Sequence, residues 1–218
     1  MADFTVYGIP GSPYVRSALL GLEEKGAGYT LVPLRFGEQK GPAHRARHPF
    51  GRIPVLEHGD FRLYETQAIL RYLDRIIPTP PLTPTDPRAE ARMNQIAGIC
   101  DWYMFRDISI TITFGRVVAP KLGLPVDEAR IAAALPAARL CIDELAALLG
   151  EQPFMAGDAL SIADLMLAPQ MTMFAESAEG RDMLAPHPAL AAWTGRMNQR
   201  PSLQRTSWER LVDANHAA

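Results

Sequence analysis

The sequence predicts a two-domain protein, an α/β domain followed by an all-α domain. Three observations lead to this prediction. Strand and helix signals alternate over residues 1–77, prolines concentrate at 78–86, and only helical patterns occur over 87–218. The 218 residues are enough for two small domains that each have a hydrophobic core.

The first domain is predicted from the order of its elements. A β-type run ends at Gly8, a helical repeat of apolar residues then runs to Lys25, and the turn at 58–60 has the signature of a hairpin. The resulting order, β-α-β and then β-β-α, is the thioredoxin-like arrangement. Strands are expected at 4–7, 29–34, 52–56 and 61–64, and helices at 14–25 and 66–76.

The second domain follows a stiff connection. Four prolines in nine residues prevent a helix at 78–86 and predict an interdomain linker. Pro136 must lie in, or kink, one of the helices beyond it. The spacing of Ser161 and Asp164 before an apolar run is that of a capping box. Helices are expected at 87–118, 127–149, 161–176, 188–199 and 202–214.

Composition excludes several classes of function. A formal net charge of -2 gives no reason to expect nucleic acid or an anionic membrane as partner. Cys100 and Cys141 are the only cysteines, and their separation argues against a disulfide framework or a Cys-x-x-Cys metal site. No run of eighteen apolar residues is present, and the N-terminus lacks the pattern of a signal peptide. We therefore expect a cytoplasmic protein without a membrane span or a bound metal.

Ser12 is the first candidate for chemistry. It lies between a predicted strand and a predicted helix, where free N–H groups and the helix dipole favour a negatively charged ligand. The alternative is that Ser12 only caps the helix, with Pro13 at its first position. Both interpretations stay open on these residues alone.

Two dipeptides suggest a site for a peptide ligand. Pro54 stands within a strand-like run, which indicates either a strand start or a cis bond. Either one leaves the backbone of Ile53 unpaired with its own sheet and free to bond an extended peptide. The alternative is an ordinary edge-strand proline. Glu65 can pair with an amine, and Thr66 at a helix start can hold a carboxylate, although Thr66 is equally a simple cap. A site that offers both of the last two contacts, from Glu65 and Thr66, suits the head group of an α-amino acid.

The chain resembles the cytosolic glutathione transferases. The stretch from Gly8 to Gly26 is similar to the opening of serine-type members, closest to phi-like and bacterial ones. Residues 48–54, His-Pro-Phe-Gly-Arg-Ile-Pro, are similar to the family's Asn-Pro-Phe-Gly-Gln-Val-Pro stretch. The stretch from Leu63 to Ile69 resembles the family's helix start, and residues 160–164 match the capping box of its helical domain.

The resemblance implies a role for each candidate. Ser12 would donate a hydrogen bond to the thiolate of glutathione, the co-substrate. Ile53 would pair through its backbone with the cysteinyl unit, with Pro54 cis. Phe50 would insert into the other subunit of a homodimer. The remaining glutathione contacts would be Glu65 and Thr66 to the γ-glutamyl group and Gln39 and Lys40 to the glycyl carboxylate, with the contact of Arg52 undefined.

The expected reaction is attack of the glutathione thiolate on a hydrophobic electrophile. A glutathione-dependent peroxidase or isomerase using the same site is one alternative, and a non-catalytic ligand-binding protein is another, because a fold does not fix a function. Tyr7, at the end of the first strand, is the rival of Ser12 as the activating hydroxyl. The residues expected to line the electrophile pocket are Tyr14, Tyr103, Phe105, Ile110 and Phe114. The alternative is that they belong to the hydrophobic core, as an aromatic stripe at helical spacing more often does.

Overall fold

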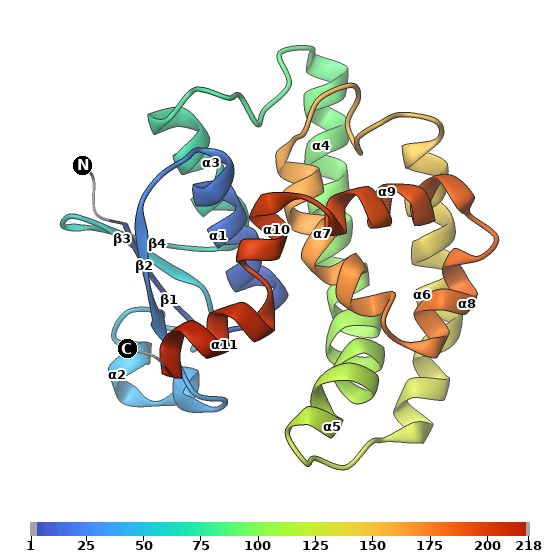
Figure 1. The fold of residues 1–218 in the computed structure, drawn as a ribbon, viewed down its shortest axis with the longest axis horizontal. Coiled ribbons are helices and arrows are strands. Elements are labelled where there is room, and N and C mark those ends of the chain that lie inside the picture. Colours follow the sequence, from blue (N-terminus) through green and yellow to red (C-terminus); the bar gives the residue numbers. More distant parts are fainter. Residues whose placement is uncertain (1–3, 217–218) are drawn as a thin grey trace. The chain divides into compact units, whose positions relative to one another are not determined.

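The computed structural model describes residues 4–216, with the side chains of residues 4–212. Contacts divide the described residues into two compact units, one made of residues 4–83 with 199–216, and the other of Pro84–Asn198. Figure 1 shows the elements of both. Within the described residues, no helix is long and apolar enough to cross a membrane.

The first unit contains the predicted mixed sheet. Its strands lie in the order β2-β1-β3-β4, with β1 parallel to β2 and antiparallel to β3. β3 and β4 form the expected hairpin. The thioredoxin-like prediction is therefore confirmed. The elements are β1 (Phe4–Gly8), α1 (Pro13–Glu24), β2 (Tyr29–Pro33), η1 (Glu38–Lys40), α2 (Pro42–Arg45), β3 (Val55–His58), β4 (Phe61–Tyr64) and α3 (Thr66–Ile76), with α10 (Pro201–Arg205) and α11 (Trp208–His216).

Alternation along β1 defines the core of this unit. Phe4 and Val6 are buried in one cluster with residues of α1 and α3, whereas Thr5 and Tyr7 are only partly buried. Successive side chains of a strand point to opposite faces. Tyr7 therefore lies on the face of the sheet opposite the core cluster.

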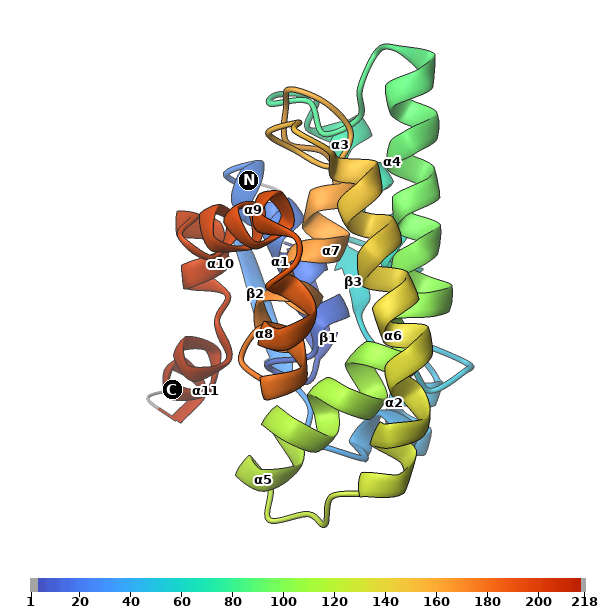
Figure 2. The same cartoon turned by 90° about the vertical axis from the view of Figure 1, so that its right-hand side faces the viewer.

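The second unit is entirely helical in its described elements. Figures 1 and 2 show η2 and α6 running side by side. The capping box at the start of α7 is present, since the Ser161 and Asp164 side chains exchange hydrogen bonds with each other's backbone. The elements are α4 (Pro87–Ile99), η2 (Cys100–Val118), α5 (Ala119–Lys121), α6 (Glu128–Leu149), α7 (Ile162–Phe174), α8 (Ala178–Leu184) and α9 (Pro188–Asn198).

Several boundaries differ from the prediction. β3 begins at Val55, because Pro54 follows a cis bond and cannot donate to a ladder. The helix expected at 87–118 changes at Cys100 to π-type hydrogen bonding, and α8 was not predicted. Part of the expected linker is packed rather than free: Leu82 is buried and donates its N–H to Asp74 of α3.

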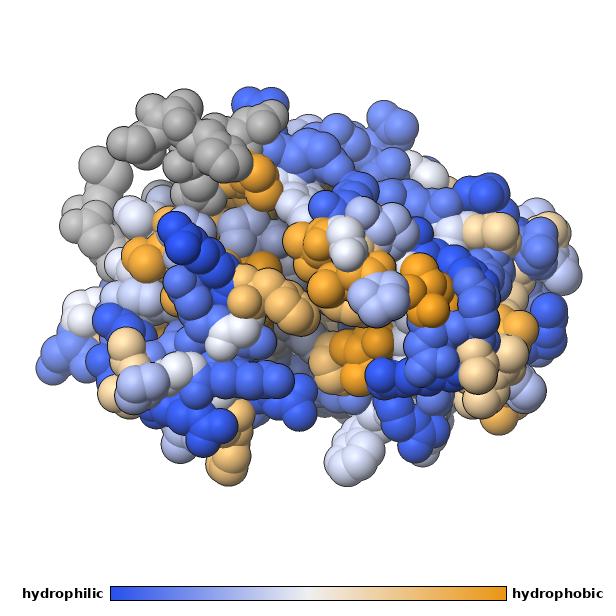
Figure 3. All heavy atoms as spheres, turned by 90° about the horizontal axis from the view of Figure 1, so that it is seen from below, coloured by the Kyte–Doolittle hydropathy of each residue, from blue (hydrophilic) through white to orange (hydrophobic). Residues whose placement is uncertain are grey.

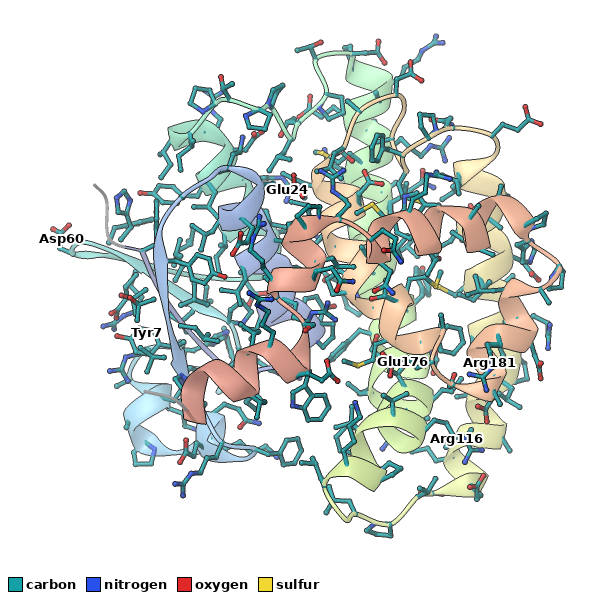
Figure 4. The ribbon with its side chains drawn as sticks, in the orientation of Figure 1. Tyr7, Glu24, Asp60, Arg116, Glu176 and Arg181 are labelled. Carbon is teal, nitrogen blue, oxygen red and sulfur yellow. The ribbon has the colours of Figure 1, made fainter. Side chains whose placement is uncertain are left out.

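The largest difference concerns the end of the chain. Residues 199–216 were expected in the helical domain but belong to the first unit. Charged contacts explain this placement. Arg200 pairs with Glu24 at 2.8 Å and Arg205 with Glu23 at 2.6 Å, and both glutamates end α1. Figure 4 labels Glu24.

Candidate functional site

Strand register brings three of the predicted site segments to one edge of the sheet. β1 ends at Gly8, four residues before Ser12. Val55, the first residue of β3, pairs with Tyr7 near the end of β1 and with Tyr64 at the end of β4. Ile53 and Pro54 therefore adjoin this edge directly, as do Glu65 and Thr66.

The hydroxyl of Ser12 is not used as a helix cap. Ser12 occupies the N-cap position of α1, yet its side chain accepts no capping hydrogen bond, and Pro13 is the first residue of the helix. Its backbone N–H closes a tight turn onto the carbonyl of Ile9 at 3.1 Å. The side chain is half-buried and has no hydrogen bond to any described residue. Ser12 therefore holds the N-cap position, with Pro13 first in the helix as that alternative had it, but its hydroxyl makes no capping bond and has no partner among the described residues.

The loop before β3 leaves the backbone of Ile53 unpaired. The Ile53–Pro54 bond is cis, as expected. Neither the N–H nor the carbonyl of Ile53 has a hydrogen bond among the described residues, and its backbone lies outside the β3 ladder. Backbone N–H and carbonyl groups need a partner when a ligand covers them. An extended peptide could supply both.

A buried histidine holds this loop, and sequence reasoning missed it. His44 of α2 is only 2% exposed, and its Nε2 lies 2.7 Å from the Arg52 carbonyl. A carbonyl oxygen only accepts hydrogen bonds, so Nε2 carries the proton. His44 thereby fixes the peptide group directly before Ile53. The spacing of His44 and His48, one helical turn apart, was the available signal.

Gly51, in the loop before β3, lies against the loop that carries Gln39 and Lys40. Its φ is +62°, and a Cβ there would lie 3.0 Å from the Gln39 carbonyl and 3.6 Å from the Lys40 Cα. The backbones of the two loops are therefore in close contact, and Gln39 and Lys40 adjoin the segment that leads to Ile53. The Gln39 amide oxygen accepts from the Gly37 N–H at 2.8 Å, and the side chains of Lys40 and Arg52 are exposed.

Glu65 has an unusual backbone conformation. It is the only non-glycine with positive φ among the described residues, at φ 72° and ψ 113°, and it occupies the N-cap position of α3. Such conformations cost about 1–3 kcal/mol and concentrate at functional sites. The side chain is exposed, and neither Glu65 nor buried Thr66 uses its side chain to cap the helix within the described part of the chain.

Tyr7 is engaged elsewhere. Its hydroxyl donates to Glu57 at 2.8 Å, and the Arg47 guanidinium lies 4.4 Å from the centre of its ring. Burial, together with the hydrogen bond and the charge of Glu57, raises the pKa of Tyr7. Figure 4 shows Tyr7 beside the sheet. A hydroxyl that already donates to a carboxylate is poorly suited to stabilise a thiolate.

The residues expected in the electrophile pocket belong to different units. Tyr14 is the second residue of α1, while the other four lie on η2. Of these four, Phe105 and Phe114 are half-buried. Tyr103 and Ile110 are 62% and 39% exposed. Figure 3 shows apolar residues exposed among hydrophilic ones on the face that it draws.

Other features do not add to the site. A hollow of about 300 Å³ in the helical unit contains none of the predicted pocket residues. No group of three or more His, Cys, Asp or Glu side chains among residues 4–212 is arranged to hold a metal ion. The hollow is lined by Glu151, Gln152, Pro153, Ala189, Ala192 and Arg196.

The chain is similar to known proteins over most of its length. Residues 2–75 match the family model "Glutathione S-transferase, N-terminal domain", and residues 128–196 match the corresponding C-terminal domain model. Glutathione S-transferase 4 of Zea mays is 33% identical over 210 residues, which cover 93% of this chain and 91% of the relative.

Solved structures are similar over the same extent. The theta-class glutathione S-transferase of Xanthomonas axonopodis pv. citri, with glutathione bound, is 31% identical, with a TM-score of 0.78 and coverage of 94% of this chain and 97% of that one. Glutathione S-transferase I from maize, in complex with an atrazine glutathione conjugate, is 28% identical, with a TM-score of 0.80 and coverage of 94% and 96%. Glutathione transferase F7 from Populus trichocarpa is 26% identical, with a TM-score of 0.82 and coverage of 93% and 97%.

Proposed function

The chain belongs to the glutathione S-transferase family, and from this premise we propose that it activates the glutathione thiol through the hydroxyl of Ser12. The predicted likeness to phi-like members is in keeping with the plant relatives, and the serine-type assignment is part of the proposal. Glutathione transfer to an electrophile is the activity of the protein, in keeping with relatives that are named glutathione S-transferases and with one solved in complex with a glutathione conjugate.

One observation carries the assignment of Ser12. Its hydroxyl makes no capping hydrogen bond at the N-terminus of α1, and it lies at the same end of the sheet as the unpaired backbone of Ile53. A free cysteine thiol has a pKa of about 8.5. Lowering it to about 6.5 requires about 2.7 kcal/mol of preferential thiolate stabilisation. A hydrogen bond to the anion supplies about 1.5–3 kcal/mol and the helix end about 0.3–1 kcal/mol, which together suffice.

The rest of the tripeptide would extend along the same edge. The unpaired backbone of Ile53 beside cis-Pro54 offers a donor and an acceptor to the cysteinyl unit. Glu65 and Thr66 would hold the γ-glutamyl group at the start of α3, where partial positive charge favours its carboxylate. The glycyl carboxylate would lie near the loop that carries Gln39 and Lys40, with Arg52 as a further free cation.

The remaining features are proposals of the same kind. The electrophile would be hydrophobic and would contact apolar side chains of η2, with Tyr14 of the first unit as a separate candidate contact. Phe50 is 70% exposed, with edge contacts to His48 and Tyr64, which favours a role as the aromatic key of a homodimer. We also propose a cytoplasmic location and a role in detoxification.

Titration of the thiol of bound glutathione tests Ser12 directly. Thiolate absorbance against pH, with the rate of conjugation of an aryl halide, is measured in wild type, Ser12→Ala and Tyr7→Phe. Ser12→Ala should lower the rate at pH 7 about tenfold and move the titration to higher pH, because a charge-assisted bond is lost, whereas Tyr7→Phe should do little. Ser17→Ala is the matched control, since that hydroxyl bonds only to the Pro13 carbonyl within the helix. If Tyr7→Phe moves the titration and Ser12→Ala does not, the assignment is wrong.

A further inference from the structure

The last helices of the chain pack along α1, with ion pairs at the end of that helix and the first residue of α11 near its start. Arg200 makes two hydrogen bonds to Glu24, at 2.8 and 3.0 Å, and Arg205 pairs with Glu23. Leu211 of α11 is 8% exposed and belongs to the core cluster of the sheet and α1. These contacts fix α10 and α11 from several sides, so the first residue of α11, Trp208, has a defined position.

Trp208 lies against Gly11, the residue before Ser12. A Cβ added to Gly11 would meet three adjacent indole carbons, Cδ2, Cγ and Cε3, at 2.8, 2.9 and 3.0 Å. Real Cβ atoms do not tolerate such contacts, so only glycine fits beneath the ring. Gly11 also has φ +86°, a conformation that glycine adopts without penalty. The indole and the turn are therefore closely packed at one point.

This contact limits how the turn can relax. The turn is closed by the bond from the Ser12 N–H to the Ile9 carbonyl, and Gly11 is its most adaptable residue. Without the ring, Gly11 could move into the space that the indole fills, and Ser12 would move with it. Reacting groups must be held within about 0.5 Å of their productive positions.

We propose that Trp208 is a positioning residue: its indole holds the Gly11–Ser12 turn so that the Ser12 hydroxyl stays directed at the thiolate. The proposal rests on the function proposed for Ser12. Trp208 acts through the turn and takes no part in the reaction itself. The C-terminal helix thus contributes to activation of a thiol that is bound by the N-terminal domain.

The test compares Trp208→Ala and Trp208→Phe with Arg205→Gln, a control that loosens α10 without touching the turn. Thiolate absorbance of bound glutathione is titrated, and kcat and KM for glutathione are measured against pH. Trp208→Ala should move the titration up by about one pH unit, which lowers the thiolate fraction at pH 7 about threefold. Its kcat should recover at high pH, with KM for glutathione little changed. Trp208→Phe should retain most of the wild-type behaviour, and Arg205→Gln all of it.

Each outcome separates this proposal from the assignment of Ser12. An unshifted titration in Trp208→Ala, with a shifted one in Ser12→Ala, would overturn the role of Trp208 alone. If Ser12→Ala leaves the titration unshifted, the proposed function itself fails. Should Trp208→Ala not fold, Trp208→Leu replaces it, since leucine fills apolar space without a planar ring, and the same shift is expected. An equal shift in Arg205→Gln would also overturn the proposal, because loosening of α10 alone would then explain the effect.

Discussion

A buried ion pair in the first unit allows a sharp test of what holds that unit together. The ammonium group of Lys25, at the end of α1, is fully buried and lies 2.6 Å from the Asp74 carboxylate of α3. It also donates to the carbonyl of Pro80, and Asp74 accepts the Leu82 N–H at 2.8 Å. One pair of charges thus joins α1 and α3 to the proline-rich segment that follows α3.

Replacing Lys25 by methionine keeps the apolar stem and removes the charge. Asp74 then remains buried without its cation, which typically costs 3–5 kcal/mol, about a third or more of the stability of an ordinary domain. Asp74→Leu should cost a similar amount. The double variant Lys25→Met/Asp74→Leu should cost far less than the sum, because it leaves no unpaired charge.

Urea unfolding followed by circular dichroism and tryptophan fluorescence measures these differences. The pH dependence gives a second test. Burial raises the pKa of Asp74, but hydrogen bonds, chiefly from Lys25, outweigh it and hold the pKa below its usual value. The contribution of the pair is therefore complete above the unfolded pKa of about 3.9 and is lost as the pH falls through the lower folded pKa. Additive costs in the double variant, or a wild-type advantage that does not decline as the pH falls below about 3.9, would refute the reasoning.

Three further predictions concern the site, the assembly and the helical unit. Glu65→Gly should raise the free energy of unfolding by about 1 kcal/mol by relieving its positive φ, yet abolish retention on immobilised glutathione, and unchanged retention would remove the proposed contact. Phe50→Ala should weaken a dimer by about 2 kcal/mol, as measured by light scattering over a dilution series; a wild-type monomer at micromolar concentration would contradict this. Asp164 is fully buried and accepts hydrogen bonds from Met155, Ser161 and Trp193. Asp164→Ala should therefore cost about 3–5 kcal/mol, and a loss under 1 kcal/mol in urea unfolding would contradict that role.

Much of the first unit could be predicted because its signals are local. The hairpin turn at 59–60, the end of β1 at Gly8 and the helix start at Thr66 depend on glycine, proline and capping chemistry within a few residues. The same applies to the Ser12 turn, where proline and glycine flank the hydroxyl. Local chemistry could not decide whether Ser12 caps its helix, because a cap and a free hydroxyl share one sequence pattern.

What could not be predicted depends on contacts between residues distant in sequence. The placement of α10 and α11 on α1 comes from ion pairs such as Arg205 with Glu23, 182 positions apart. The spacing of apolar residues along the chain does not predict which distant charges will pair. The missed helix α8 had a local signal, since Ser177 caps it by accepting the Gly180 N–H at 2.9 Å, but a helix of seven residues containing glycine is too short for a periodic pattern.

The residues at the edge of the sheet show why a site of this kind departs from local preference. Gly11 and Gly51 adopt positive φ without penalty, but Glu65 does so at a cost that glycine would avoid. Its φ of 72° sets the direction of the glutamate at the very start of α3, where its exposed carboxylate forms no cap of the helix. Strain of this size persists only when the surroundings enforce it, and here the β4 ladder holds the preceding residue, Tyr64, against Val55 while the Glu65 carbonyl accepts the Ile69 N–H at 2.9 Å. Because the conformation contributes nothing to stability, the simplest account is that it orients the carboxylate toward a ligand, and stability and binding should then change in opposite directions when Glu65 is replaced by glycine.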